Sequence, residues 1–295
     1  MSNLNVSRAE RLDQRVVAIM PLLSRSFATK LISDGKVTIN GVVTTKGGTK
    51  LKPEDSVIIN YEHEEFVIPD ITLPVLYEDD DCVVIEKPMG LLTHSKGAFN
   101  PEPSVATWLH NRIEDKTLIE ADAHQPNRRA GIVHRLDRAT SGVMIAAKTT
   151  NALTWLQRQF SQRKVQKTYL AIVAGHLKQP EAVIDMPVER NPKAPATFRV
   201  GVNGKPAITR YRVLRETDHY SLVELHPETG RTHQLRVHMG QLGHPIVGDT
   251  LYRGKPAERL YLHAAQLEIT IPARSRQAFE SPLPPEFLEL LDGDK

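Results

Sequence analysis

The stretch that most constrains the fold of this chain covers residues 131–148, GIVHRLDRATSGVMIAAK. Its second half contains an apolar run, residues 143–147, which is typical of a buried strand. Just before that run, Asp137 lies between Arg135 and Arg138. A rigid buried element beside alternating charges is a common way to hold a reactive carboxylate, so Asp137 is the candidate catalytic residue. From this stretch alone, a structural ion pair with the neighbouring arginines remains the simpler interpretation.

The composition is that of an ordinary globular protein. Of 295 residues, 40% are hydrophobic and 25% are charged, and the net charge of +3 allows a nucleic-acid partner without requiring one. No apolar stretch approaches the roughly 18 residues that span a bilayer, and the N-terminus lacks the apolar segment of a secretory signal. The single cysteine, Cys82, stands in an apolar run and is expected in the core rather than as a nucleophile. We therefore expect a cytoplasmic protein.

The first 62 residues predict a small α+β domain. One helical pattern covers residues 12–19, and a second opens at Ser24, a plausible N-cap, and ends near residue 35. Val37–Ile39 and Val57–Ile59 alternate as short strands do, and Asn40-Gly41 is a hairpin turn signal.

Basic residues are frequent in this domain, and on a generic helix they would form a solvated face. The segment, however, resembles the S4 domain, a small RNA-binding module. The resemblance rests on four motifs in order: Arg11-Leu12-Asp13, Ser24-Arg25-Ser26, Gly35-Lys36-Val37 and Ile39-Asn40-Gly41. It implies that Arg11, Ser24, Arg25 and Lys30 face RNA phosphate. That agrees with the sequence-independent, salt-sensitive affinity that Arg and Lys supply.

A proline-containing acidic linker over residues 63–74 separates this domain from a longer one over residues 75–295. The longer part predicts strands at residues 82–85, 143–147, 167–176, 208–214, 221–227 and 259–272, and helices at residues 106–113 and 153–160. Residues 180–206 contain five prolines and are expected to form a turn-rich excursion with little helix. Many strands with few helices predict a mixed α+β fold around a largely antiparallel sheet.

Twelve histidines raise the question of a metal site, but their spacing does not support one. His233 and His238 would lie about 140° apart on a helix and on opposite faces of a strand. The chain also lacks a GxxxxGK[ST] loop, a GxGxxG loop after a strand and a G-x-S-x-G elbow. We therefore expect no metal site, and the absence of these motifs indicates neither a phosphate-binding loop nor a serine nucleophile.

Leucine and methionine at helical spacing in residues 235–242 predict the buried stripe of a short helix. Arg236 lies one position off that stripe, where it can emerge at the edge and point into a cleft. A partly buried arginine needs a carboxylate partner. Asp137 is the natural candidate, and Glu228 and Asp249 are alternatives.

Two residues of the predicted cleft could act on a nucleotide. Cations near Asp137 favour its ionised form, which can serve as nucleophile or general base or can stabilise an oxocarbenium ion at a sugar carbon. Tyr169 stands on a predicted strand, where a tyrosine is usually a core residue. In a nucleobase pocket it would instead offer a stacking face and a weakly acidic hydroxyl.

Together these motifs resemble the RluA-type pseudouridine synthases, from about residue 77 to the C-terminus. The matching landmarks follow in order: Glu86-Lys87-Pro88 with Gly90-Leu91, His134-Arg135-Leu136-Asp137 with Thr140-Ser141-Gly142, Lys167-Thr168-Tyr169, Gly204-Lys205-Pro206-Ala207, residues 230–238 (GRTHQLRVH), Gly243-His244-Pro245-Ile246 with Gly248-Asp249, and Leu262-His263-Ala264. So many ordered motifs argue against a chance match. An S4-like module ahead of this domain is an arrangement seen in many members that act on ribosomal RNA.

The resemblance implies that the chain converts uridine in RNA to pseudouridine. Asp137 would be the catalytic carboxylate at the sugar, and Arg236 would pair with it. Tyr169 would pack on the uracil and help to remove the C5 proton. Arg135 would enter the RNA stack to hold the target nucleotide out of it. No redox step and no net hydrolysis occur, so the family needs no cofactor.

The expected partner is therefore RNA, in the first place the 23S RNA of the large ribosomal subunit, and we expect a monomer with no membrane contact. One alternative is a synthase of the same family that acts on transfer RNA. Another is an RNA-binding or ribosome-assembly factor that keeps the fold without catalysis. The presence of Asp137, Tyr169 and Arg236 argues against the last alternative.

Overall fold

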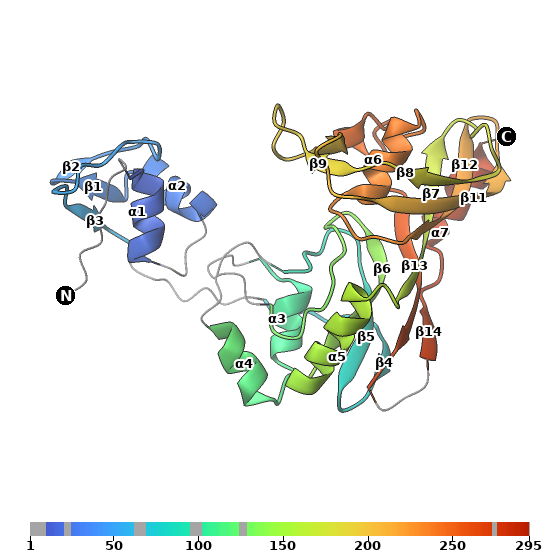
Figure 1. Ribbon diagram of the computed structural model, residues 1–295, viewed down its shortest axis with the longest axis horizontal. Helices are drawn as coiled ribbons and strands as arrows, with labels where there is room; N and C mark the ends of the chain where they lie inside the picture. The colour runs from blue at the N-terminus through green and yellow to red at the C-terminus, as the bar shows by residue number, and fades with distance from the viewer. Residues whose placement is uncertain are drawn as a thin grey trace.

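The computed structural model describes residues 10–20, 25–61, 69–94, 102–123, 129–272 and 276–294. Within these ranges the chain forms a small N-terminal module and a larger domain built on a nine-stranded sheet (Figure 1). No helix in the described ranges is long and apolar enough to cross a membrane.

The N-terminal module packs two helices against a three-stranded sheet. Its elements are α1 (Leu12–Ile19), α2 (Arg25–Ser33), β1 (Val37–Ile39), β2 (Val42–Val43) and β3 (Val57–Ile59), with strand order β2-β1-β3. Leu12 and Val16 of α1 meet Ala28 and Ile32 of α2 in one buried cluster. The helices and both predicted strands are present, whereas Ser24 lies outside the described residues.

The hairpin of this module differs from the sequence expectation in its second strand. Asn40 and Gly41 both have positive φ angles, 51° and 81°, as a two-residue hairpin turn requires. The turn joins β1 to the two-residue β2, and β3 then adds to the other side of β1. A strand of two residues is too short to show an alternating pattern, so the sequence did not reveal β2.

The large sheet confirms the predicted mixed α+β fold with a largely antiparallel sheet. Its order is β4-β5-β6-β13-β7-β12-β11-β8, and β14 also pairs with β13. The strands are β4 (Val75–Glu78), β5 (Cys82–Lys87), β6 (Ser141–Ala147), β7 (Gln166–Ala174), β8 (Glu181–Asp185), β11 (Ile208–Glu216), β12 (Tyr220–Pro227), β13 (Leu262–Thr270) and β14 (Arg276–Glu280). All pairings are antiparallel except that of β6 with β13.

Helices pack on the sheet and complete three buried clusters. They are α3 (Val105–His110), α4 (Lys116–Ala123), α5 (Thr150–Ser161), α6 (Gln234–Gln241) and α7 (Pro285–Gly293). Thr149 caps α5 by accepting a hydrogen bond from the backbone N–H of Ala152, and Leu156 is buried between α5 and the sheet. Cys82 lies in the same cluster, where burial raises the pKa of its thiol to about 12. The thiol therefore stays protonated, as expected for a core residue.

The proline-rich segment contains no helix, as expected, but it contains more strand than the sequence indicated. β8 adds to the edge of the main sheet, and β9 (Val188–Arg190) pairs with β10 (Phe198–Val200) as a separate two-stranded ribbon. The prolines occupy the connections between these strands, because proline cannot donate a ladder hydrogen bond. Outside this segment, the sequence also did not predict four elements: β4, β14, α4 and α7.

The parallel contact between β6 and β13 depends on a glycine. Gly142 pairs with Ala264 and has a φ of +118°, a conformation that side chains with a Cβ rarely adopt. A Cβ at this position would overlap the carbonyl oxygen of Ala264. The strand that follows Asp137 can therefore approach β13 only because residue 142 has no side chain.

We predict that Gly142→Ala destabilises the protein by about 2–5 kcal/mol, since backbone strain and overpacking act together. Gly243→Ala is the matched control, because Gly243 also has a positive φ, +86°, but no atom of a described residue lies within 4 Å of its added Cβ. The control should lose only about 1–2 kcal/mol. Urea denaturation of both variants measures the difference, and equal losses would contradict the close approach of β13.

Candidate active site

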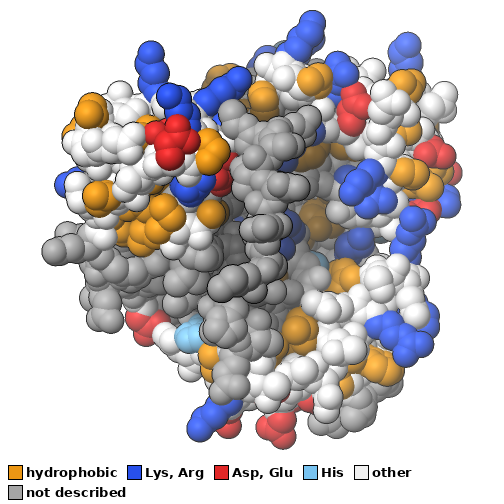
Figure 2. Space-filling view, turned by 60° about the vertical axis from the view of Figure 1, so that its left-hand side comes forward, with side chains coloured by type: hydrophobic (Ala, Val, Ile, Leu, Met, Phe, Trp, Pro, Cys, Tyr) orange, Lys and Arg blue, Asp and Glu red, His pale blue; other side chains and the backbone are white. Residues whose placement is uncertain are grey.

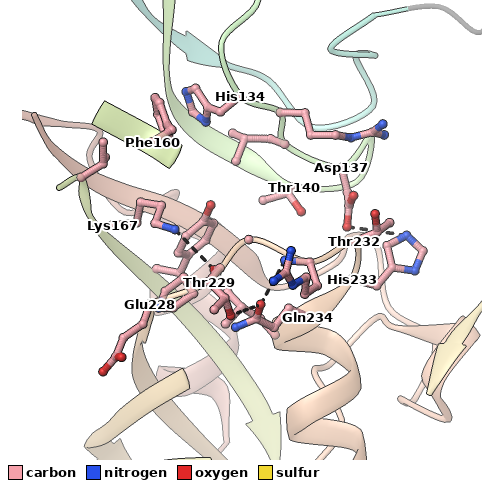
Figure 3. A pocket seen from close by; sticks show the side chains of 18 of the residues that line it. His134, Asp137, Thr140, Phe160, Lys167, Glu228, Thr229, Thr232, His233 and Gln234 are labelled. Atoms are coloured by element: carbon pink, nitrogen blue, oxygen red, sulfur yellow. Dashed lines mark hydrogen bonds and ion pairs between the residues drawn. The ribbon is translucent and has the colours of Figure 1, made fainter. Parts of the chain in front are cut away.

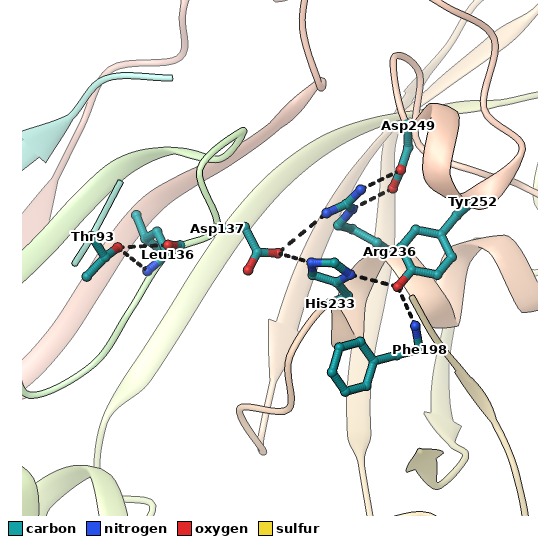
Figure 4. Close-up of polar contacts among 8 residues, drawn as sticks. All are labelled: Thr93, Leu136, Asp137, Phe198, His233, Arg236, Asp249 and Tyr252. Atoms are coloured by element: carbon teal, nitrogen blue, oxygen red, sulfur yellow. Dashed lines mark hydrogen bonds and ion pairs between the residues drawn. The ribbon is translucent and has the colours of Figure 1, made fainter. Parts of the chain in front are cut away.

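Asp137 lies in an irregular loop just before β6, and the loop is fixed by its backbone. The hydroxyl of Thr93 donates to the Leu136 carbonyl (2.8 Å) and accepts from the Leu136 N–H (3.2 Å) (Figure 4). On the other side, the N–H of Thr140 donates to the carbonyl of Asp137 (3.0 Å). Leu136 is buried, while 19% of the Asp137 side chain is exposed. The carboxylate is thus presented to solvent from a rigid support.

Lys87 supports the same loop from β5. Its fully buried ammonium donates to the carbonyls of Pro88 and Leu91 (both 2.9 Å) and reaches the carbonyl of Arg138 (3.4 Å). Burial lowers the pKa of Lys87 to about 8, and the negative charge of Asp137 opposes that shift. Lys87 therefore ties the turn after β5 to the residue that follows Asp137.

Arg236 is held beside Asp137 by a different carboxylate. It is buried on α6, and its Nε and Nη2 atoms donate to the two oxygens of Asp249 (both 2.7 Å). Its Nη1 atom lies 3.7 Å from Oδ2 of Asp137, which is longer than a hydrogen bond. The third candidate partner, Glu228, pairs with Arg210 (2.8 Å). Arg236 thus faces Asp137 while its position is set by Asp249.

His233 is a site residue that the sequence reasoning considered only as a possible metal ligand. It is the N-cap of α6, with a left-handed φ of 56°, and its Nε2 lies 3.7 Å from the same Asp137 oxygen that faces Arg236. The spacing of His233 and Arg236, three residues apart, would have placed both on one face of a helix start. That three-residue spacing is the sequence feature that could have identified His233 as a neighbour of Asp137.

Tyr169 lies on β7 and lines the pocket that contains Asp137. Burial raises the pKa of its phenol, and the charge of Asp137 raises it further. Lys167 stands two residues earlier on the same face, and its Nζ is 3.4 Å from the Thr229 carbonyl. Burial, with a contribution from the nearby Arg163, lowers the pKa of Lys167 to about 8. The phenol of Tyr169 is protonated at neutral pH and is a poor proton acceptor.

The pocket has a volume of about 580 Å³ (Figure 3). It is lined by residues 133–137, Thr140, side chains of α5 and β7, and residues 227–236. Arg135 is exposed at this pocket, and no hydrogen bond or ion pair holds it to another described residue, whereas Arg138 pairs with Glu102 (2.6 Å). Within the described ranges, no group of three or more His, Cys, Asp or Glu side chains is placed to hold a metal ion.

His134 fastens the Asp137 loop to β6. The N–H of Ile145 donates to His134 Nε2 (3.1 Å), and the imidazole stacks on Phe160 with ring centroids 4.6 Å apart. Burial lowers the pKa of His134 to about 3, with a smaller contribution from the charge of Lys167. The ring is therefore neutral, with Nε2 as an acceptor.

In the N-terminal module, one buried carboxylate holds two of the predicted RNA contacts together. Asp13 accepts from Nε of Arg11 (3.0 Å) and from Nε of Arg25 (2.9 Å), and the hydrogen bond with Arg11 is the main factor that lowers the pKa of Asp13. The arginines and Lys30 are exposed. Ser24, the fourth predicted contact, lies outside the described residues.

Comparison with known proteins places this pocket in a family. A family model described as RNA pseudouridylate synthase matches residues 81–241, which is more than half of the chain. The chain belongs to this family. An S4 domain model matches residues 10–57, so this RNA pseudouridylate synthase carries an S4 domain at its N-terminus.

Named relatives and solved structures agree with that assignment. Ribosomal large subunit pseudouridine synthase D of Escherichia coli (strain K12) is 36% identical, and the protein of the same name from Vibrio parahaemolyticus is 35% identical. Each match covers 96% of this chain and 90% of the relative. The solved structure of Human RNA Pseudouridylate Synthase Domain Containing 1 is 31% identical, with a TM-score of 0.59, over 75% of this chain and 87% of the human chain. The protein is thus a pseudouridine synthase, which is an isomerase.

We predict that acid weakens this enzyme partly through His134. Its folded pKa of about 3 lies below the ordinary value of 6.5, so between these values the unfolded chain binds a proton that the folded chain does not. Stability should therefore fall as the pH drops from 6.5 toward 3, by about 2 kcal/mol at pH 5 relative to pH 7 from this group.

Denaturation of wild type and His134→Gln at both pH values measures this effect. The glutamine can still accept the Ile145 hydrogen bond but does not titrate, so its acid loss should be smaller by that amount. If both proteins lost the same stability between pH 7 and pH 5, folding would not lower the pKa of His134, and the prediction would be wrong.

Proposed function

We propose that this protein isomerises specific uridines of the 23S RNA in the large ribosomal subunit, with Asp137 as the catalytic carboxylate. The names of its relatives support the substrate. The observation that carries the catalytic role is the placement of Asp137, which projects from a fixed loop into a pocket opposite Arg236. A volume of about 580 Å³ is in the range of small-ligand sites and accommodates one flipped nucleoside.

The proposed reaction conserves all atoms. The bond between N1 and C1′ breaks, the uracil turns, and C5 bonds to C1′. The proton on C5 leaves, and N1 takes up a proton. A carboxylate beside C1′ can attack that carbon or stabilise the positive charge that develops there. The neighbouring Arg236 places a positive charge 3.7 Å from Oδ2 of Asp137 without a short hydrogen bond to it.

The other pocket residues would bind the nucleotide. Tyr169 would pack its ring on the uracil, and its protonated phenol favours this role over removal of the C5 proton. Arg135, exposed and without a partner among the described residues, would enter the RNA stack in place of the target base. Extracting a base costs a few kcal/mol, and such an insertion would offset part of that cost.

The S4 domain would add affinity without sequence preference, through Arg11, Arg25 and Lys30. Figure 2 shows Lys and Arg side chains projecting from several places on one face of the molecule, as expected for a protein that meets phosphate. We place the domain boundary in a linker over residues 63–74, between residues 1–62 and 75–295. We further propose that the protein acts in the cytoplasm as a monomer.

We predict that Asp137→Asn lowers turnover by at least about 10²–10⁴-fold while RNA affinity stays within about threefold of wild type. Release of tritium from RNA labelled at uracil C5 measures turnover, and filter binding measures affinity. Asp80→Asn, an exposed aspartate in the turn between β4 and β5, is the matched control and should retain full activity.

The same assay separates the alternatives. Equal tritium release from wild type and Asp137→Asn would exclude Asp137 as the catalyst. Tritium release from transfer RNA but not from 23S RNA would show that transfer RNA, and not 23S RNA, is the substrate. Binding of RNA without any release by wild type would indicate a factor that no longer catalyses.

We also predict that the S4 domain contributes to the salt dependence of RNA binding. Replacing Arg25 and Lys30 by glutamine should flatten the slope of log K against log salt by about 1.4–1.8, if each contacts one phosphate. Lys178 and Lys255, exposed lysines outside the S4 domain, are the control pair for the same double substitution. Identical slopes for wild type and the S4 variant would mean that these two side chains do not meet phosphate.

A further inference from the structure

One oxygen of Asp137 faces two donors from the same helix start. Arg236 Nη1 and His233 Nε2 each lie 3.7 Å from Oδ2 of Asp137 (Figure 4). Among the described residues, no hydrogen bond engages Oδ1. In both contacts Oδ2 is the carboxylate oxygen that meets the donor, so the two oxygens of Asp137 have different surroundings.

The proton of His233 is assigned by a chain of hydrogen bonds behind the ring. The backbone N–H of Phe198 donates to the phenol oxygen of Tyr252 (2.9 Å), and that oxygen lies 2.7 Å from His233 Nδ1. A backbone N–H can only donate, so the phenol accepts from it. Among the described residues, Nδ1 is the remaining partner for the phenol hydrogen, so Tyr252 donates to His233. Nδ1 is then the acceptor, and a neutral ring carries its proton on Nε2, which faces Asp137.

The ionisation of both rings agrees with this assignment. Burial lowers the pKa of His233, although the charge of Asp137 partly opposes the shift. Burial also raises the pKa of Tyr252, so its phenol keeps the hydrogen that it donates. Both groups are therefore neutral at neutral pH.

The orientation of the His233 ring is fixed by packing as well as by hydrogen bonding. The Phe198 ring meets it edge to face at a centroid distance of 5.5 Å, and the Tyr252 ring does so at 5.6 Å. The left-handed backbone at His233 sets the direction in which the side chain leaves α6. Few other orientations are open to the ring.

We propose that His233 is a positioning residue for Asp137, with Tyr252 fixing it in the form that carries the proton on Nε2. The Nε2–H and Arg236 together would hold one carboxylate oxygen, so that the other faces the ribose. A separation of 3.7 Å is too long for a hydrogen bond, and catalytic contacts commonly shorten when substrate binds. Because the His233 ring is neutral, its Nε2–H can orient the Asp137 carboxylate without adding a second positive charge beside it. This inference rests on the proposed catalytic role of Asp137.

Two substitutions distinguish positioning from simple packing. The terminal amide of asparagine falls near Nδ1, so His233→Asn keeps a partner for Tyr252 but cannot reach Asp137. The terminal amide of glutamine falls near Nε2, so His233→Gln restores a donor to Asp137. We expect the single-turnover rate to fall about 10–100-fold in His233→Asn and to recover most of the way in His233→Gln, with RNA affinity unchanged.

His244→Asn is the matched control, because the His244 ring, beyond the end of α6, bonds the backbone carbonyl of Ala174 (2.9 Å) and no other described residue. It should keep the wild-type rate. A purely structural role for His233 would lower the melting temperature of both His233 variants, and the glutamine would then give no recovery of rate.

The position of the proton is measurable without any substrate. In two-bond ¹H–¹⁵N correlation spectra of the labelled full-length protein, His233 should show a protonated Nε2 and a bare Nδ1, with its signals assigned by their loss in His233→Asn. Tyr252→Phe should shift this balance toward a protonated Nδ1. A protonated Nδ1 in wild type would overturn the inference.

The activity outcomes separate the two levels of proposal. If wild type makes pseudouridine and His233→Asn keeps its rate, the role of His233 is wrong while the proposed function stands. If wild type makes no pseudouridine, the proposed function fails, and the role of His233 fails with it.

Discussion

The active site depends on the buried ion pair between Arg236 and Asp249. A buried arginine is strongly unfavourable without a partner, and the bidentate contact with Asp249 supplies one. Because two guanidinium nitrogens are used there, only Nη1 is left for Asp137, and it stays 3.7 Å away. Asp137 therefore lies close to the positive charge of Arg236 but is not hydrogen-bonded to it. A direct bidentate pair with Arg236 would have left the carboxylate less free to react.

The opposite wall of the pocket is rigid for another reason. The Asp137 loop has no regular hydrogen-bond ladder, so side chains from elsewhere satisfy its backbone. Thr93 binds both polar atoms of Leu136, and Lys87 reaches the carbonyl of Arg138. His134 connects the loop to β6. Together these contacts immobilise Asp137 without using its side chain, which is the condition for a preorganised catalytic group.

Sequence patterns predicted the parts of this fold that repeat or are wholly apolar. Residues 143–147 are buried on both faces and read as an uninterrupted run, and Leu235 and Met239, which are four residues apart, are both buried on α6. The pattern did not reveal edge strands such as β4 and β14, which are short and half exposed. Periodicity carries little information for such elements.

Within the site, the sequence could identify candidate catalytic residues but not which charged side chains pair with one another. Three acidic residues were possible partners for Arg236, and their separations along the chain gave no reason to prefer Asp249. His233 was overlooked because its spacing was tested only against metal geometry. Histidine is also not among the preferred N-cap residues, and a positive φ is uncommon outside glycine, so residue preferences would not have placed His233 at the start of a helix.

The parallel contact between β6 and β13 has a consequence for the order in which the enzyme is made. Ser141 and His263, which are paired there, lie 122 positions apart, whereas the S4 domain is stabilised by contacts within its first sixty or so residues. Contacts between residues close in sequence can form early in synthesis, whereas contacts between residues far apart in sequence form only after the later residue has been made. During translation, the part proposed to hold RNA is therefore complete while the pocket still lacks Arg236, Asp249 and β13. During synthesis, the proposed RNA-binding domain can therefore fold before the catalytic pocket is complete.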